Sequence, residues 1–158
     1  MSDQIPYSPP PPAEAPAAAA LTTLQKADLL RGVGVFSEIR VEELYRLASI
    51  AKVVGFPADV VLFRQNDSAV AFYIVVRGEV GLTRQGSDDR EVVGPEQAVG
   101  LHSVLTQEPC AARATALEDT VAIAVGAEDF YNLLSNNTEI VASIFKCMIR
   151  KLELGTKS

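Results

Sequence analysis

The sequence is poor in the residues that build metal sites and disulfide frameworks. Its 158 residues include two cysteines, Cys110 and Cys147, and a single histidine, His102. A structural zinc site needs several cysteine or histidine ligands in close pairs, so we expect no metal site. Two isolated cysteines in a chain of this size indicate reduced thiols, which favours a cytoplasmic protein.

Basic residues and long apolar runs are also scarce. The chain carries 14 Lys and Arg against 20 Asp and Glu, a formal net charge of −6. Nucleic-acid binding normally uses clustered positive charge, so we expect no nucleic-acid partner. The longest apolar run of the body, residues 69–76, is too short to span a membrane. The first basic residue is Lys26, which argues against a secretory signal, so we expect no direct membrane insertion.

The first 20 residues differ in composition from the rest. Six of the nine prolines fall within residues 6–16, and alanines occupy residues 17–20. Proline removes backbone donors and alanine has little to bury, which predicts a disordered Pro/Ala-rich tail over residues 1–20. The tail is interpreted as a tether, with a proline-rich ligand for a partner as the alternative.

Residues 21–152 read as one domain, followed by a short tail over residues 153–158. Apolar spacing predicts helices near residues 22–32, 41–51, 127–134 and 137–152. Between them, short β-branched runs alternate with turn residues, which is typical of antiparallel strands. The expected fold class is mainly β, an antiparallel double-stranded β-helix or jelly-roll-like β-roll with N- and C-terminal helices. Phe36 is expected to plug the core.

No catalytic constellation is evident. His102 would have to serve as the base for its neighbour Ser103, and sequence adjacency does not supply that geometry. The acidic pairs lie at turns or helix starts, which favours solvated caps over general acids. These pairs are Glu42-Glu43, Asp88-Asp89, Glu118-Asp119 and Glu128-Asp129. We therefore expect a protein that is not an enzyme.

The order of many short motifs resembles that of the cyclic nucleotide-binding domain family, from about residue 24 to residue 152. The resemblance rests on Phe56-Pro57, Val61-Leu62-Phe63-Arg64, Asp67, Phe72-Tyr73-Ile74-Val75, Arg77-Gly78-Glu79-Val80, Gly100, Pro109, Ala116-Leu117-Glu118-Asp119-Thr120 and Asp129-Phe130. It implies a β-roll with helices at both ends, a regulatory role and a protein effector as partner.

The family's ligand cassette reads Phe-Gly-Glu-Leu-Ala, then a loop, then Pro-Arg-Ser/Thr-Ala. The candidate cradle of this chain is Gly100, Leu101, His102, Ser103, Cys110, Ala111 and Arg113. Leu101 stands in place of the glutamate, Cys110 in place of the arginine and Ala111 in place of the hydroxyl residue. An arginine bond to phosphate contributes about 1.5–3 kcal/mol, so its loss weakens binding about tenfold or more.

Two functional interpretations remain open. In the first, Leu101, Cys110 and Ala111 make the cradle apolar, and a regulatory module binds cyclic AMP or cyclic GMP weakly or not at all. In the second, a genuine cyclic nucleotide sensor uses Gly100, backbone donors and Arg113, although strand alternation places Arg113 opposite Cys110 unless a bulge intervenes.

Three smaller points also stay open. Cys110 reads as a small buried residue, with a redox-sensing thiol as the alternative. The terminal helix either packs on the roll or forms a homodimer with its twin. A transcription regulator would need a helix-turn-helix after this helix, and we expect none in the six residues that follow Leu152.

Overall fold

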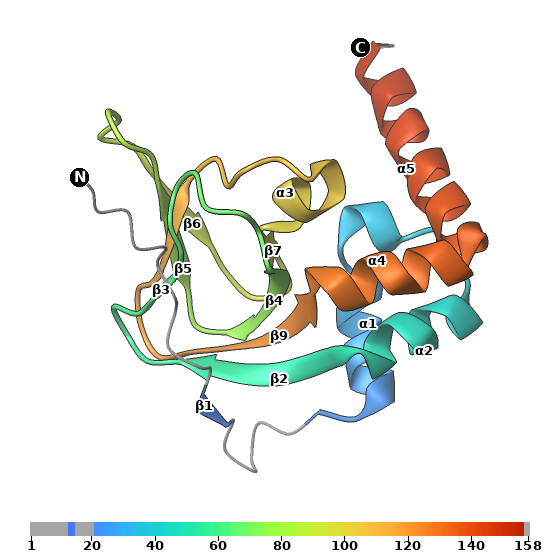
Figure 1. Cartoon of the computed structure of the whole chain (residues 1–158), viewed down its shortest axis with the longest axis horizontal. Coiled ribbons are helices and arrows are strands. Elements are labelled where there is room, and N and C mark those ends of the chain that lie inside the picture. Colours follow the sequence, from blue (N-terminus) through green and yellow to red (C-terminus); the bar gives the residue numbers. More distant parts are fainter. Residues whose placement is uncertain (1–12, 15–20, 157–158) are drawn as a thin grey trace.

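A computed structural model describes the backbone of residues 13–14 and 21–156, and the side chains of residues 21–152. Helices precede and follow a roll of short strands (Figure 1). The helices are α1 (Thr23–Arg31), the 3-10 turn η2 (Gly34–Phe36), α2 (Val41–Ser49), α3 (Leu101–Thr106), α4 (Ala127–Asn136) and α5 (Thr138–Thr156). The strands are β1 (Ala13–Glu14), β2 (Ala51–Phe56), β3 (Val61–Phe63), β4 (Ala71–Arg77), β5 (Val80–Thr83), β6 (Arg90–Val93), β7 (Ala98–Val99), β8 (Arg113–Ala116) and β9 (Thr120–Gly126).

The strands form two antiparallel sheets, and together these sheets make up the roll. One sheet has the order β1-β2-β9-β4-β7 and the other the order β3-β8-β5-β6. Strands distant in sequence pair directly, as where Tyr73 of β4 lies opposite Ala124 of β9. The predicted fold class, an antiparallel β-roll with flanking helices, is confirmed.

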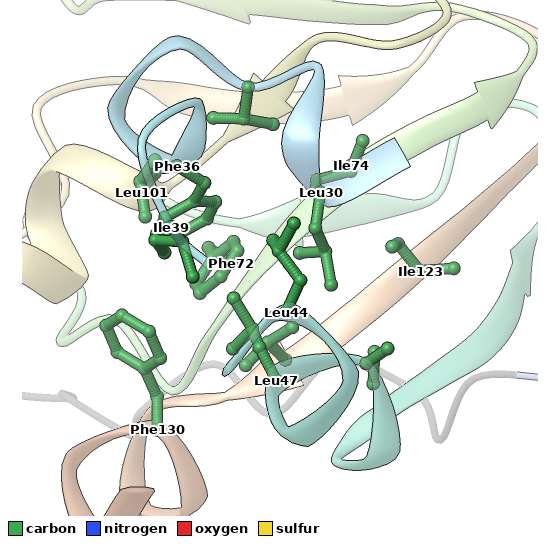
Figure 2. Packing of buried hydrophobic residues seen from close by; sticks show 14 of the residues in the cluster. Leu30, Phe36, Ile39, Leu44, Leu47, Phe72, Ile74, Leu101, Ile123 and Phe130 are labelled. Atoms are coloured by element: carbon green, nitrogen blue, oxygen red, sulfur yellow. The ribbon is translucent and has the colours of Figure 1, made fainter. Parts of the chain in front are cut away.

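Alternation along β4 divides the interior into two cores. Phe72 and Ile74 point outward to the helices, while Tyr73 and Val75 point into the roll. We call these the helical core and the roll core. The helical core gathers large side chains from α1, η2, α2, α4 and α5 on one face of the sheet (Figure 2). Phe36 is completely buried there, as predicted.

Local sequence explains the helix ends on the N-terminal side. The Thr22 hydroxyl accepts the Gln25 amide at 3.1 Å, and the Gln25 side chain accepts the Thr22 amide at 2.9 Å. This reciprocal capping box satisfies two amides at the start of α1, the helix predicted from Thr22 onward.

Asn137 lies between α4 and α5, but its side chain donates back to the Leu133 carbonyl at 2.9 Å.

One predicted boundary needs correction. Within the predicted tail, Ala13–Glu14 pair antiparallel with Val54 and Gly55 of β2. The remainder of that tail lies outside the described residues. At the other end α5 continues to Thr156, so residues 153–156 are helical rather than a tail. The reason is that residues 152–154 hold no helix breaker before Gly155.

The helices were also compared with the dimensions of a bilayer. In the part of the chain that the structure describes, none combines the length and hydropathy that crossing a membrane requires.

Candidate ligand cradle

Gly100 is the hinge between β7 and α3. Its φ of +83° lies in the left-handed region, which glycine adopts without steric cost. The space beside it is already filled, because an added Cβ would lie 3.3 Å from the Phe63 ring and 3.4 Å from the Ala71 carbonyl oxygen. Phe63, which the sequence did not single out as a site residue, therefore packs against the backbone that begins the cassette.

Leu101 does not line the cradle. Its side chain is 9% exposed and belongs to the helical core, beside Phe36 and Ile39 in Figure 2. The expectation that Leu101 makes the cradle apolar is therefore wrong. The physical reason is that α3 is a single short helix between two cores, and its first residue turns toward the helices. Leu101 instead anchors the cassette to the helical core.

His102 and Ser103 diverge from each other. The His102 side chain is 77% exposed, and its Nε2 lies 3.7 Å from a Glu108 carboxylate oxygen. Ser103 is buried, and its hydroxyl donates to the Pro109 carbonyl at 3.5 Å. A catalytic serine would need the histidine on its hydroxyl. The arrangement does not resemble a nucleophile and base.

Cys110 is the buried centre of the cassette, with 1% of its surface exposed. Its amide donates to the Asp67 carbonyl at 2.8 Å, and its carbonyl accepts the Asn66 amide at 2.8 Å. Burial raises the pKa of the Cys110 thiol; a hydrogen bond with Ser103 lowers this pKa, and the nearby Asp67 carboxylate raises it. A protonated, enclosed thiol favours the reading of Cys110 as a small core residue.

Arg113, the one arginine or lysine of the candidate cradle, points away from the buried face at the end of the cassette. Ala111 is exposed, Ala112 and Ala114 are buried, and Arg113 between them is exposed at the start of β8. The bulge of this sheet region lies at Val61 and Phe63 on β3. Arg113 thus lies on the face opposite Ala112 and Ala114, as strand alternation predicts.

Two of the cavities that border the cassette have polar linings, and neither lining carries the net positive charge that would favour phosphate. One of about 270 Å³ lies between α3 and α4, with Glu108 as its charged lining residue. The other, of about 130 Å³, lies at the β5–β6 end of the roll, and Arg84, Asp89 and Glu91 are its charged lining residues. Both volumes are below the roughly 300–1,000 Å³ typical of small-molecule pockets.

Sequence reasoning missed Phe63, Asp89 and Glu91 as cradle neighbours. The strand register places Glu91 opposite Leu82, so both lie on the inner face of the roll. Knowing this register would have identified Glu91, because residues directly opposite in an antiparallel pair share a face. Of the expected site residues, the structure brings together Ser103 and Cys110 beside Gly100.

The two wrapped sheets, the short helix α3 beside them and the flanking helices define a β-roll. A family model for the cyclic nucleotide-binding domain matches residues 53–137, more than half of the 158 residues. The chain belongs to the cyclic nucleotide-binding domain family. The resemblance seen in the sequence motifs is thereby confirmed.

Known proteins support this assignment. The chain is 28% identical over 127 residues to the cyclic AMP receptor protein of Thermus thermophilus, covering 78% of this chain and 59% of that relative. It is similar to the N-terminal domain of a transcriptional regulator from Streptomyces coelicolor, with 26% identity, a TM-score of 0.71, and coverage of 82% and 93%. A cyclic nucleotide-binding-like protein from Brucella abortus gives 29% identity, a TM-score of 0.61, and coverage of 70% and 97%.

These relatives bear on the expected partners. The chain spans about three fifths of the Thermus relative. Because the Streptomyces relative is named a transcriptional regulator, the expectation of no nucleic-acid partner gains no support. A regulatory role agrees with the name of the Streptomyces relative.

Proposed function

We propose that this chain is a non-catalytic regulatory module of the cytoplasm in which ordinary cyclic AMP or cyclic GMP binding is weak or lost. The observation that carries the proposal is Cys110, a buried neutral thiol where the family pattern has its arginine. A cyclic phosphate in that position would lack its charge-assisted bond. The module instead acts on a protein effector.

The surroundings of Cys110 support the same conclusion. The Asp67 carboxylate is close enough to influence the thiol, and Asp89 and Glu91 line the nearby end of the roll. Asp67 is already paired with Arg64, whose Nε lies 3.7 Å from Asp67 Oδ2, and Arg84 shares its end of the roll with the two carboxylates Asp89 and Glu91. These surroundings leave no net positive charge for an anion. Arg113, the cation expected to rescue binding, is exposed on the other face of β8. Phe63 occupies the space beside Gly100 that close approach of a ligand would need.

A titration of the unmodified protein tests the proposal. Isothermal calorimetry with cyclic AMP and with cyclic GMP is expected to show no saturable binding at micromolar concentrations. Tight stoichiometric binding of either nucleotide would establish the genuine sensor instead and overturn the proposal.

A gain-of-binding variant sharpens the test. Phe63→Ala with Cys110→Arg opens the space at Gly100 and supplies a cation. We expect cyclic AMP affinity about tenfold or more above that of Phe63→Ala alone, the matched control. Circular dichroism checks that each variant keeps its fold. Equal affinity in the folded pair would show that the missing arginine is not what limits binding.

We further propose that α5 joins two copies of the module. Its inner face, with Ile140, Ile144 and Cys147, is buried. A second face stays open, with Phe145 59%, Met148 42%, Ile149 53% and Leu152 69% exposed. These residues repeat every three or four positions, the spacing of a helix-pairing seam.

Sedimentation equilibrium tests this assembly. The unmodified chain is expected to sediment as a dimer and Phe145→Glu as a monomer, because the new charge would be buried at the seam. Lys146→Glu, an exposed position next to Phe145, is the control and is expected to remain dimeric. A monomeric unmodified chain would refute the proposal.

A further inference from the structure

Glu43 on α2 is a buried carboxylate. The residue is 9% exposed, and it lies among the buried residues Leu44, Leu47 and Ala48 of the same helix. From the sequence, Glu42 and Glu43 were both interpreted as solvated residues at a helix start. Only Glu42 fits that description, since 71% of its side chain is exposed.

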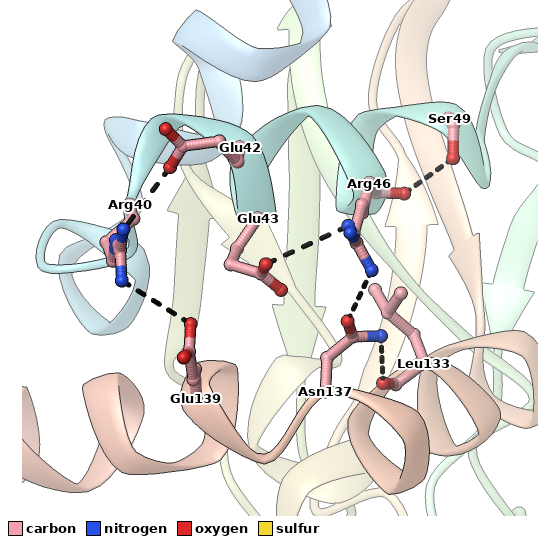
Figure 3. Close-up of polar contacts among 8 residues, drawn as sticks. All are labelled: Arg40, Glu42, Glu43, Arg46, Ser49, Leu133, Asn137 and Glu139. Atoms are coloured by element: carbon pink, nitrogen blue, oxygen red, sulfur yellow. Dashed lines mark hydrogen bonds and ion pairs between the residues drawn. The ribbon is translucent and has the colours of Figure 1, made fainter.

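The two carboxylate oxygens of Glu43 have different surroundings. Oε1 lies 3.8 Å from the Arg46 Nε, whereas Oε2 is buried and has no hydrogen-bond partner. Figure 3 shows the carboxyl group reaching from α2 toward the start of α5, with Asn137 and Glu139 beside it. A buried carboxylate oxygen without a donor is costly, so each such atom requires an explanation.

The polar groups around Glu43 already bond elsewhere. Arg46 Nη1 donates to the Asn137 Oδ1 at 2.7 Å, and Asn137 Nδ2 donates to the Leu133 carbonyl at 2.9 Å. Asn136 Nδ2 donates to the Asn132 carbonyl at 3.0 Å. If Glu43 served only to cap the N-terminus of α5, its Oε2 would accept a hydrogen bond from a backbone amide of that helix. Oε2 accepts no hydrogen bond.

A cavity of about 370 Å³ opens at this junction of α2, α4 and α5. It is lined by Glu43, Arg46, Asn136, Asn137, Thr138 and Glu139. Glu139 is already paired with Arg40, whose Nη1 lies 3.6 Å from Glu139 Oε2, so Glu43 and Glu139 face two guanidinium groups, those of Arg40 and Arg46. The need for an N–H donor therefore comes from the unpaired oxygen of Glu43.

We propose that this cavity receives a cationic side chain, arginine or lysine, from a protein partner. The Glu43 side chain turns toward the cavity, and its Oε2, which has no hydrogen-bond partner, accepts an N–H bond from the cation. The site is separate from the cradle. It would let a protein effector contact the module through a positively charged side chain. It can therefore succeed or fail whether or not the cradle binds a cyclic nucleotide.

Nuclear magnetic resonance on the full chain tests the proposal. The probes are Nα-acetyl-argininamide, Nα-acetyl-lysinamide and the neutral analogue Nα-acetyl-citrullinamide. We expect the cationic probes to cause saturable amide shifts at Glu43, Thr138 and Glu139. The citrulline probe should bind about tenfold more weakly or not at all, because it lacks the charge.

A matched pair of variants locates the binding. Glu43→Gln keeps the shape of the side chain and is expected to weaken binding of the arginine probe about tenfold. Glu42→Gln removes the same charge one residue away and should leave the affinity unchanged. Equal loss in both variants would indicate general charge attraction and overturn the proposal.

The unmodified chain alone also decides the question, even if Glu43→Gln fails to fold. Absence of saturable shifts, or identical shifts with the arginine and citrulline probes, would overturn the proposal.

Discussion

The helical core and the roll core use different side chains. In the helical core Phe36, Phe72 and Phe130 pack together with ring centroids 5.4–6.2 Å apart. The roll core is mainly valine and alanine, with one aromatic pair, Phe56 and Tyr73, 5.4 Å apart. Large rings dock the helices firmly on the sheet, whereas small residues leave room inside the roll. The cassette lies between them, with Leu101 in one core and Val99 in the other.

The largest expected effect comes from breaking the aromatic cluster of the helical core. Phe72→Ala removes a completely buried ring and is expected to destabilise the protein by about 3–5 kcal/mol. Urea denaturation measures the change. Phe145→Ala, which truncates an exposed ring, should change the stability of the isolated chain by less than about 0.5 kcal/mol. Similar losses from both variants would contradict the two-face description of α5.

Leu101 tests which core holds the cassette. Because it packs with Phe36 in the helical core, Leu101→Ala is expected to cost about 2–3 kcal/mol. His102→Ala, at the exposed neighbouring position, should cost less than about 0.5 kcal/mol. Thermal denaturation of the two variants gives the comparison. A negligible effect of Leu101→Ala would place its side chain in the open cradle instead.

Gly100 tests the tightness of the roll side. Gly100→Ala must adopt a φ of +83° and meet Phe63 at 3.3 Å, so we expect a loss of about 1–2 kcal/mol. Adding Phe63→Ala to both backgrounds separates the two causes. If Phe63 contributes, the Gly100→Ala penalty should be smaller when the ring is absent. An unchanged penalty would assign the whole cost to backbone strain.

The smallest expected effect comes from titration of the buried Cys110 thiol. Burial raises the pKa of Cys110 in the roll, so the folded state holds this proton more strongly than the unfolded state. Its contribution to stability is complete below the unfolded pKa of about 8.5 and is lost as the pH rises above it. Stability measured from pH 7 to pH 10 should fall less in Cys110→Ser.

Much of the architecture could be predicted from the sequence. Turn residues between β-branched runs indicated the antiparallel strands, and Phe36 was correctly expected in the core because it is the large apolar residue between two helices. The terminal helix was expected either to pack on the roll or to pair with a second copy of itself. In the structure it has one buried face and one exposed apolar face. That division depends on the direction in which α5 leaves α4, which no local pattern encodes.

The site was harder to predict, for identifiable reasons. Leu101 could face either core, because α3 is a short helix between two buried regions and an apolar side chain fits either of them. Phe63 approaches Gly100 across 37 positions of sequence, and that contact follows from the closure of the roll. Glu43 looked like an ordinary acidic residue at a helix start. Its burial depends on α4 and α5, which come about 90 positions later in the chain.

The division into two cores also sets the smallest fragment that can fold. The family match, residues 53–137, includes Phe72, Ile74 and Phe130 but omits α1, η2, α2 and all of α5. An expression fragment cut at those limits would expose one whole side of its sheet to water and is expected to aggregate. Cloning limits for crystallisation or labelling should therefore enclose at least residues 21–152.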